Sequence, residues 1–375
     1  MKIRHSKAKE ALASILAIAD IEIGGQDPWD IQVHDDRLYS RVLSEGSLGL
    51  GEAYMDGWWD CGSLDELFAR ILGSKLDSKV KLNLALIKEA VISKLFNTQT
   101  KSRAFEVGER HYDIGNDLYE GMLDKRMIYT CGYWDKAKDL DSAQEAKLDL
   151  VCRKLGLKSG DRVLDIGCGW GGFLKFAAER YGISGVGVTV SKEQVALAQE
   201  RCKGLPIEIR LEDYRDINEK FDHIVSLGMF EHVGYKNYRA YMKVAERSLK
   251  DGGLFLLHTI GGNLSVHGTD AWIEKYIFPN SMLPSMKQIT SSYEGLFVME
   301  DWHNFGADYD KTLMSWFSNF DRAWLKIRSA YSQRFYRMWK YYLLTCAGSF
   351  RARKNQLWQI VLSKDGVAGG YKSIR

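Results

Sequence analysis

A cluster of glycines next to an acid is the first group of residues in this sequence that could do chemistry. Residues 163–172 read VLDIGCGWGG, in which an apolar run leads into Asp165 and then into four glycines within six positions. Gly167, Gly169 and Gly172 fit the GxGxxG spacing, which allows a tight turn from a strand into a helix and brings the backbone close to a nucleotide. The stretch therefore predicts a site for a nucleotide-containing cofactor.

Two classes of cofactor fit this glycine turn. A dinucleotide site needs an acid about 20 residues further on, at the end of the second strand, but that strand here ends in Thr189 and Ser191. Asp165 beside the turn can instead hold a cationic amino-acid group, while Asp213 and Tyr214 after the third strand can bind and stack on a purine. This combination is similar to the first motif of the S-adenosylmethionine-dependent methyltransferases, which we favour over NAD-binding proteins. The missing ribose acid departs from the general methyltransferase pattern, so these residues alone leave both cofactors open.

A second group of polar side chains follows the later strands of the pattern. Glu231 and His232 come after one strand, in MFEHVG, and His258 lies in the next, in LFLLHTIGG. Cys131 stands upstream in MIYTCGYW and Tyr309 downstream in FGADYDKT. A carboxylate, an imidazole and a phenol that meet at one edge of a sheet can bind a small polar species or move a proton. Each residue alone also has a structural explanation, since single histidines are often satisfied structural groups and buried cysteines often fill the core.

The elements that must position these residues follow an alternating pattern. From about residue 105, apolar strands alternate with helices, which we expect over residues 171–181, over residues 192–202 and up to Leu249. Such alternation predicts an α/β fold with a doubly wound, mostly parallel sheet covered by helices on both faces. Ligands of these sheets bind at the carboxyl ends of the strands, where both groups of residues are expected.

The first part of the chain predicts two further segments. Residues 1–73 mix short helix and strand patterns and predict a smaller α+β domain, which we interpret as lipid-binding. Residues 74–104, rich in Lys and Arg and free of glycine and proline, predict a basic helical connector that either lies on anionic lipid or packs against the protein body. Trp58 and Trp59 are similarly either core residues or interfacial anchors. Residues 105–375 then form the catalytic domain.

Composition argues against several other classes. The 375 residues carry a net charge of +3, and their six cysteines are far apart, without the spacing of a zinc site or a disulfide framework. We therefore expect no metal, no nucleic-acid partner and a reducing, cytoplasmic environment. No apolar run reaches the roughly 20 residues that cross a bilayer, so any membrane contact is expected to be peripheral.

Taken together, the motifs resemble those of a known family, the bacterial cyclopropane-fatty-acyl-phospholipid synthases. They lie in order over about residues 105–353 and read HYDIGNDLYEGML, MIYTCGYW, VLDIGCGWGG, GVTVSKEQ, DYRDI, GMFEHVG, LLHTIG, KYIFPN, LPS, DWHNFGADYDKTL and TCAGSFRAR. The segment GSLGLGEAYMDGWWD, residues 46–60, resembles the same enzymes and is shared less with the shorter mycolic-acid cyclopropane synthases. The resemblance therefore favours the branch that acts on phospholipids.

The resemblance implies a class I methyltransferase fold and a particular reaction. The methyl carbon of S-adenosylmethionine is added to a cis double bond of an unsaturated phospholipid acyl chain, a bound bicarbonate ion removes a proton, and a cyclopropane ring closes. It also implies a homodimer, peripheral at the inner membrane face. Two alternatives stay open: a related methyltransferase whose product is methyl-branched or methylene, or whose substrate is a soluble small molecule, and a lipid-binding protein with a vestigial cofactor site.

The resemblance also assigns residues by their positions in the motifs. It implies bicarbonate ligands from the side chains of Glu231, His258 and Tyr309 and from main-chain groups of Cys131 and Ile260. Protonated Glu231 or cationic His258 would donate to this anion. The residues that it places around the cofactor are Tyr129, Thr130, Gly167, Gly169, Thr189, Gln194, Asp213 and Tyr214. Since this family itself has Thr189 at the ribose position, the departure noted above no longer counts against S-adenosylmethionine.

Two features near the end of the sequence have both a structural and a functional interpretation. Cys346, in TCAGSF, is a lesser catalytic candidate, for which we favour a structural role because the alkene itself attacks the methyl group. Residues 316–342 contain ten aromatic residues. They predict either core packing or an apolar pocket for an acyl chain.

Overall fold

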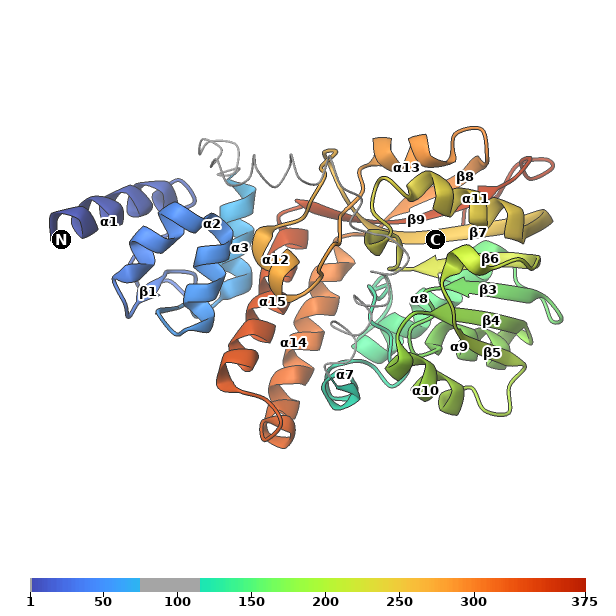
Figure 1. Cartoon of the computed structure of the whole chain (residues 1–375), viewed down its shortest axis with the longest axis horizontal. Helices are drawn as coiled ribbons and strands as arrows, with labels where there is room; N and C mark the ends of the chain where they lie inside the picture. Colours follow the sequence, from blue (N-terminus) through green and yellow to red (C-terminus); the bar gives the residue numbers. More distant parts are fainter. Residues whose placement is uncertain (1, 75–114) are drawn as a thin grey trace. The chain divides into compact units, whose positions relative to one another are not determined.

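The computed structural model describes residues 2–74 and 115–375, whose contacts divide them into two compact units (Figure 1). The helical unit consists of residues 2–74, 268–279 and 309–355. The sheet unit consists of residues 115–267, 280–308 and 356–375. The chain therefore passes between the two units several times.

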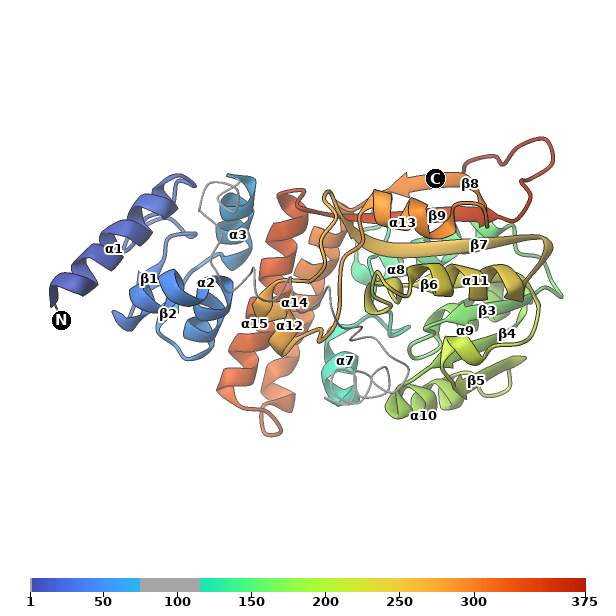
Figure 2. The same ribbon diagram turned by 45° about the horizontal axis from the view of Figure 1, so that its top comes forward.

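The sheet unit is built on a seven-stranded sheet. Its strands are β3 (Arg162–Ile166), β4 (Ser184–Thr189), β5 (Ile207–Leu211), β6 (Phe221–Leu227), β7 (Leu249–Gly262), β8 (Val298–Asn304) and β9 (Asn355–Ser363). Their order across the sheet is β5-β4-β3-β6-β7-β9-β8, which can be followed in Figure 2. The strands from β5 to β7 pair in parallel, and β8 pairs antiparallel with β9. The mostly parallel sheet predicted from the sequence is confirmed.

Helices cover both faces of this sheet. They are α8 (Leu140–Leu155), α9 (Gly172–Tyr181), α10 (Lys192–Arg201), α11 (Tyr238–Ser248) and α13 (Met286–Tyr293). The unit also contains α7 (Asn116–Met122) and the short 3-10 turns η1 (Tyr214–Asp216) and η2 (Phe230–His232). Successive residues of a strand point to opposite faces, so neighbours in β3 belong to different cores. Val163 packs in the core formed with α8 and α9, and Leu164 in the core formed with α11 and α13. The sheet is therefore doubly wound.

The helical unit has an aromatic interior. Its elements are α1 (Lys2–Ala17), β1 (Gln32–Val33), α2 (Arg37–Met55), β2 (Trp59–Asp60), α3 (Leu64–Gly73), α12 (Ala271–Tyr276), α14 (Asp308–Ile327) and α15 (Gln333–Arg351). The side chains of Trp316, Phe320 and Trp339 are fully buried. Core packing is therefore confirmed for these three members of the aromatic stretch, and an acyl-chain pocket stays a prediction.

Helix α15 packs closely on α3. A Cβ atom on Gly348 of α15 would lie 2.4 Å from the main-chain oxygen of Asp65, so the approach of the two helices requires glycine at this position. The guanidinium of Arg351 forms ion pairs with Asp65 at 2.8 Å and with Glu66 at 3.2 Å. A helix from late in the sequence thus completes a unit that begins at its start.

This grouping differs from the contiguous boundaries predicted from the sequence. Residues 268–279 and 309–355 lie within the predicted catalytic domain, 105–375, but pack with the N-terminal residues because their apolar faces are buried there. Apart from Ser74, the connector 74–104 lies outside the described residues, and the lipid-binding role of 1–73 stays a prediction. Within residues 2–74 and 115–375, no helix is both long and apolar enough to cross a bilayer.

Candidate active site

The glycine turn follows β3 within the parallel part of the sheet. The main-chain N–H groups of Gly167 and Cys168 donate to the Val188 carbonyl oxygen of β4, at 3.0 and 3.1 Å. Gly167 has a φ of +85°, and a Cβ atom there would lie 2.7 Å from the Cβ and Cγ atoms of Met229. Both the conformation and the space require glycine. Glycine therefore lets the chain turn at the carboxyl end of β3 with the Met229 side chain packed against it.

Asp165 of β3 is a buried acid with unused hydrogen-bonding capacity. Its side chain is 2% exposed, and its Oδ1 atom has no hydrogen-bond partner among the residues that the structure describes. Burial raises the pKa of this carboxyl to about 7, and the positive charge of Lys147 partly opposes the rise. A buried acid with one oxygen that has no partner in the described part of the chain is suited to a cationic ligand group. The turn and the acid together fit the methionine part of S-adenosylmethionine.

Lys147 of α8 is a candidate that the sequence analysis missed. Its side chain is fully buried, its Nζ donates to Thr130 Oγ1 at 2.8 Å, and burial lowers its pKa to about 8. The signal available in the sequence was its place on the apolar stripe of the helix, four residues from the fully buried Ala143 and Val151. Lys147 therefore positions Thr130 and interacts electrostatically with Asp165.

Four predicted cofactor residues lie at the ends of β4 and β5. The Thr189 hydroxyl donates to Gln194 Oε1 at 2.7 Å, which joins the end of β4 to α10. Asp213 follows β5, is 2% exposed, and accepts from the main-chain N–H of Arg215 at 3.0 Å. Tyr214 is buried beside it. Because β5, β4 and β3 are neighbours, the structure brings these residues to the same edge as the glycine turn, and their contact with a cofactor stays a prediction.

Residues 129–131 lie against the end of β6. A Cβ atom on Gly228, which follows β6, would lie 2.6 Å from the Cγ2 atom of Thr130. Tyr129 is half-buried and Cys131 is fully buried. The structure therefore places these three predicted residues beside the carboxyl end of the sheet.

Glu231 is a buried carboxyl with one oxygen bound and the other unsatisfied. It lies in η2, directly after β6, and its Oε1 accepts from the main-chain N–H of Ile260 in β7 at 2.6 Å. Its Oε2 is buried and has no hydrogen-bond partner within the described part of the chain. Burial raises the pKa of Glu231 to about 7. Protonated and ionised forms are therefore both populated near neutral pH, as proton exchange requires.

His258 of β7 is the second buried group at this edge. Its ring is 1% exposed, its Nδ1 lies 3.3 Å from the Nε2 of Gln359 in β9, and its Nε2 has no partner among the described residues. Burial, aided by the positive charges of Lys147 and Lys154, lowers the pKa of His258 well below its usual value. Of the two donors considered from the sequence, protonated Glu231 or cationic His258, these pKa shifts favour protonated Glu231, because desolvation disfavours the charged imidazolium.

Two of the predicted residues belong to the helical unit. Tyr309 of α14 is buried, with its ring 4.5 Å from that of Phe350 and 5.9 Å from that of Trp316. Cys346 of α15 is half-buried, and burial raises the pKa of its thiol to about 12. A thiol in this state is a poor nucleophile at neutral pH, which agrees with the structural role that we favoured for Cys346.

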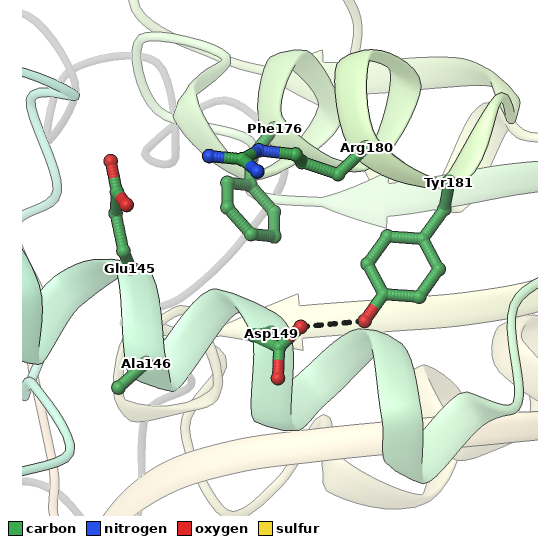
Figure 3. A pocket seen from close by; sticks show the side chains of 6 residues that line it. All are labelled: Glu145, Ala146, Asp149, Phe176, Arg180 and Tyr181. Atoms are coloured by element: carbon green, nitrogen blue, oxygen red, sulfur yellow. Dashed lines mark hydrogen bonds between the residues drawn. The ribbon is translucent and has the colours of Figure 1, made fainter. Parts of the chain in front are cut away.

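A cavity of about 480 Å³ lies between α8 and α9 (Figure 3). Its lining residues are Glu145, Ala146, Asp149, Phe176, Arg180 and Tyr181. The Tyr181 hydroxyl donates to Asp149 Oδ1 at 2.6 Å across its edge. No residue predicted for the cofactor or the bicarbonate ion lines this cavity, so it is not the candidate site.

The raised pKa of Glu231 makes the free energy of unfolding depend on pH. The folded protein keeps this proton up to about pH 7, whereas an unfolded Glu releases it near pH 4.3. The folded state is therefore destabilised as pH rises through this window, because the carboxyl must ionise in its buried position. We expect Glu231→Gln to unfold with nearly the wild-type free energy at pH 4 and to exceed it by about 3 kcal/mol at pH 8. Urea unfolding of both proteins checks this, and an equal difference at the two pH values would contradict it.

Comparisons with known proteins agree with the fold and the motifs. The family described as mycolic acid cyclopropane synthetase matches residues 99–360. The cyclopropane-fatty-acyl-phospholipid synthase of Escherichia coli (strain K12) is 55% identical over 361 residues, which cover 96% of this chain and 94% of that protein. The tuberculostearic acid methyltransferase UfaA1 of Mycobacterium tuberculosis is 32% identical over 355 residues, which cover 88% of this chain and 82% of that protein.

Two solved structures resemble the chain over a shorter length. The cyclopropane synthase MmaA2 from Mycobacterium tuberculosis aligns with a TM-score of 0.66 at 30% identity, over 69% of this chain and 98% of that one. The mycolic acid cyclopropane synthase CmaA1, solved with SAH and CTAB, aligns with a TM-score of 0.66 at 32% identity and the same coverage. The resemblance inferred from the motifs is confirmed, and we conclude that this chain belongs to the mycolic acid cyclopropane synthetase family.

Proposed function

We propose that this protein is a cyclopropane-fatty-acyl-phospholipid synthase. It adds the methyl carbon of S-adenosylmethionine to a cis double bond of an unsaturated phospholipid acyl chain and closes a cyclopropane ring. The observation that carries this proposal is the 55% identity to the Escherichia coli synthase, which extends over 96% of the chain and so includes most of the helical unit. The mycolic acid cyclopropane synthase structures align with only 69% of it, which favours the phospholipid substrate.

The chemistry makes particular demands on the residues of the sheet unit. S-adenosylmethionine supplies an electrophilic methyl group when it is bound. An isolated alkene is a weak nucleophile, so the reacting carbons must be held together in a dry site where water cannot trap the positive charge. Asp165 would hold the amino group of the cofactor next to the glycine turn at the end of β3. One proton must then leave the transferred carbon as the ring closes.

Glu231 and His258 are suited to binding the ion that takes this proton. Each presents a buried polar atom, Oε2 or Nε2, without a partner among the described residues. We propose that these two atoms bind a small oxyanion, bicarbonate, together with Cys131; a contribution from Tyr309, which belongs to the helical unit, stays a prediction of the family resemblance. The Ile260 N–H already donates to Glu231, and the Ile260 carbonyl oxygen already accepts from Thr259 Oγ1 at 3.0 Å. A main-chain contact of Ile260 with the hydroxyl of bicarbonate would therefore use the second lone pair of that oxygen.

The test is a transfer assay on vesicles of monounsaturated phospholipid with methyl-labelled S-adenosylmethionine. Bicarbonate is present in one arm and rigorously removed in the other, and the recovered acyl chains are analysed by mass spectrometry and proton NMR. Labelled ring carbon that falls when bicarbonate is removed is the expected result. Labelled methyl-branched or methylene chains would show that the protein uses S-adenosylmethionine but forms a different product. Binding to vesicles without transfer would indicate a lipid-binding protein.

The helical unit is proposed to bring the substrate from an anionic membrane surface, with a homodimer at the inner face as the working arrangement. Trp59 is fully buried and its Nε1 donates to the Leu50 carbonyl oxygen at 3.0 Å, so it is a core residue. Trp58 is half-buried, with the guanidinium groups of Arg37 and Arg41 at 4.4 and 5.0 Å from its ring. Both guanidinium groups also pair with acids, Arg37 with Asp35 and Arg41 with Asp56, so the cations do not distinguish Trp58. Because Trp59 is buried, Trp58 is the member of the tryptophan pair that can reach a membrane, and it is therefore the proposed contact.

Trp58→Ala is expected to lower binding to anionic vesicles several-fold without loss of folding. Trp29 is a matched control, because it is also half-buried in the helical unit and has the Arg70 guanidinium 3.7 Å from its ring. Vesicle co-sedimentation at low and high salt measures both variants. Equal effects of the two substitutions, or binding indifferent to salt and anionic lipid, would contradict the proposed contact.

A further inference from the structure

The ring of His258 has one hydrogen-bonding neighbour within the described part of the chain, the side-chain amide of Gln359. The amide Nε2 lies 3.3 Å from the imidazole Nδ1, and the two side chains are 0% and 1% exposed. β7 and β9, which carry the two residues, are adjacent strands of the sheet. Water therefore does not reach this contact, and the amide decides how the ring is protonated.

An amide nitrogen is always a hydrogen-bond donor, so the Nδ1 atom that faces it must accept. A neutral imidazole has one proton on its ring nitrogens, and that proton is then on Nε2. The Nε2–H group is buried and has no partner among the described residues. It is therefore a donor available to a ligand. The opposite arrangement, with the amide oxygen facing Nδ1, would place the proton on Nδ1 and make Nε2 a base.

The surroundings of the ring favour the neutral form. Burial and the positive charges of Lys147 and Lys154 both act against an imidazolium. A second proton on the ring would also turn Nδ1 into a donor that faces another donor. His258 at this position is suited to giving a hydrogen bond to an anion.

We propose that Gln359 is a positioning residue that holds His258 as its Nε2–H tautomer, so that His258 donates a hydrogen bond to the proton-accepting anion and does not itself take the proton. This assignment rests on the proposed function for the identity of the anion. It divides the roles at the site: the anion takes the proton from the substrate, Glu231 can exchange a proton with the bound anion, and His258 is a fixed donor.

The first test is the tautomer of His258 in the full-length wild-type protein. Nitrogen-15 NMR of protein labelled at histidine distinguishes protonated from unprotonated ring nitrogens, and the signal of His258 is assigned by its loss in His258→Gln. We expect protonated Nε2 and unprotonated Nδ1 between pH 6 and 8. A proton on Nδ1, or on both nitrogens, would overturn the inference whatever the activity of the protein.

Variants at Gln359 test whether the amide sets this state. Gln359→Glu places an acceptor opposite Nδ1 and is expected to move the proton to Nδ1 or to protonate the ring, with at least a 10-fold fall in kcat and little change in KM for S-adenosylmethionine. Gln359→Met keeps the volume without a donor and is expected to give a mixture of tautomers. An unchanged wild-type tautomer in both variants would overturn the role of Gln359.

Gln356→Glu is the matched control, since Gln356 is also buried in β9 but is bound to Asn304 at 3.1 Å. It is expected to leave the His258 signals unchanged, and a shift equal to that of Gln359→Glu would mean that added charge, and not the contact, sets the tautomer. Failure of the proposed function is a separate result: an Nε2–H tautomer in a protein that forms no labelled ring leaves the positioning role intact.

Discussion

Glu231→Gln is expected to lose turnover by about 10²- to 10⁴-fold, the range that general acid–base groups contribute, while it binds S-adenosylmethionine as the wild type does. Gln keeps the shape of the side chain and can still accept from the Ile260 N–H, which now lies 2.6 Å from Oε1. It cannot take up or release a proton, whereas the pKa of Glu231, raised by burial to about 7, allows both near neutral pH. Single-turnover rates and equilibrium binding of the cofactor measure the two effects separately.

The control for this prediction is Glu246→Gln, which removes a carboxylate from α11 without touching the site. It should leave both turnover and cofactor binding near wild type. Equal losses of turnover and cofactor affinity in Glu231→Gln would place Glu231 in the cofactor site and would contradict the role proposed here.

Gly167→Ala is expected to weaken binding of S-adenosylmethionine by at least about 10-fold. A left-handed backbone costs a residue with a side chain about 1–2 kcal/mol, and the added Cβ would also lie 2.7 Å from Met229. The turn at the end of β3 must therefore move. Gly169→Ala is the matched control, because its φ is +53° and no atom of the described residues lies within 4 Å of an added Cβ. Within the described part of the protein itself, Gly169→Ala therefore adds the conformational cost without a steric clash.

Isothermal titration of both glycine variants with S-adenosylmethionine checks this prediction, with circular dichroism as the test of folding. The expected order of affinity is wild type, then Gly169→Ala, then Gly167→Ala. A stronger loss in Gly169→Ala would mean that contact with the cofactor, and not the space around the turn, determines affinity at these positions.

The sequence allowed the sheet and its cofactor edge to be predicted because both depend on local patterns. Apolar strands alternate with helices, and the glycine turn and Glu231 immediately follow strands, so the topology alone brings them to one edge. Lys147 and Gln359 were missed for the opposite reason. Their importance depends on the contacts with Thr130 and His258, and residues so far apart in sequence give no joint pattern in a single chain.

The grouping of residues into two units could not be predicted from the sequence, for a similar reason. The pattern from residue 105 onwards gave no sign that residues 309–355 belong with the N-terminal helices. Their burial depends on the match between α15 and α3, where Gly348 meets Asp65. Such a match is a property of two surfaces and is visible only in the folded chain.

The packing of α15 on α3 also sets the order in which the protein can fold during its synthesis. Helix α3 leaves the ribosome early, but its partner helix is among the last elements to be made. The sheet has the same dependence, since β9, from late in the chain, lies between β7 and β8. Neither unit can complete its packing until residues 333–363 have emerged. The apolar surfaces of the early helices therefore remain exposed for most of translation, which makes the nascent chain a natural client for chaperones that bind such surfaces.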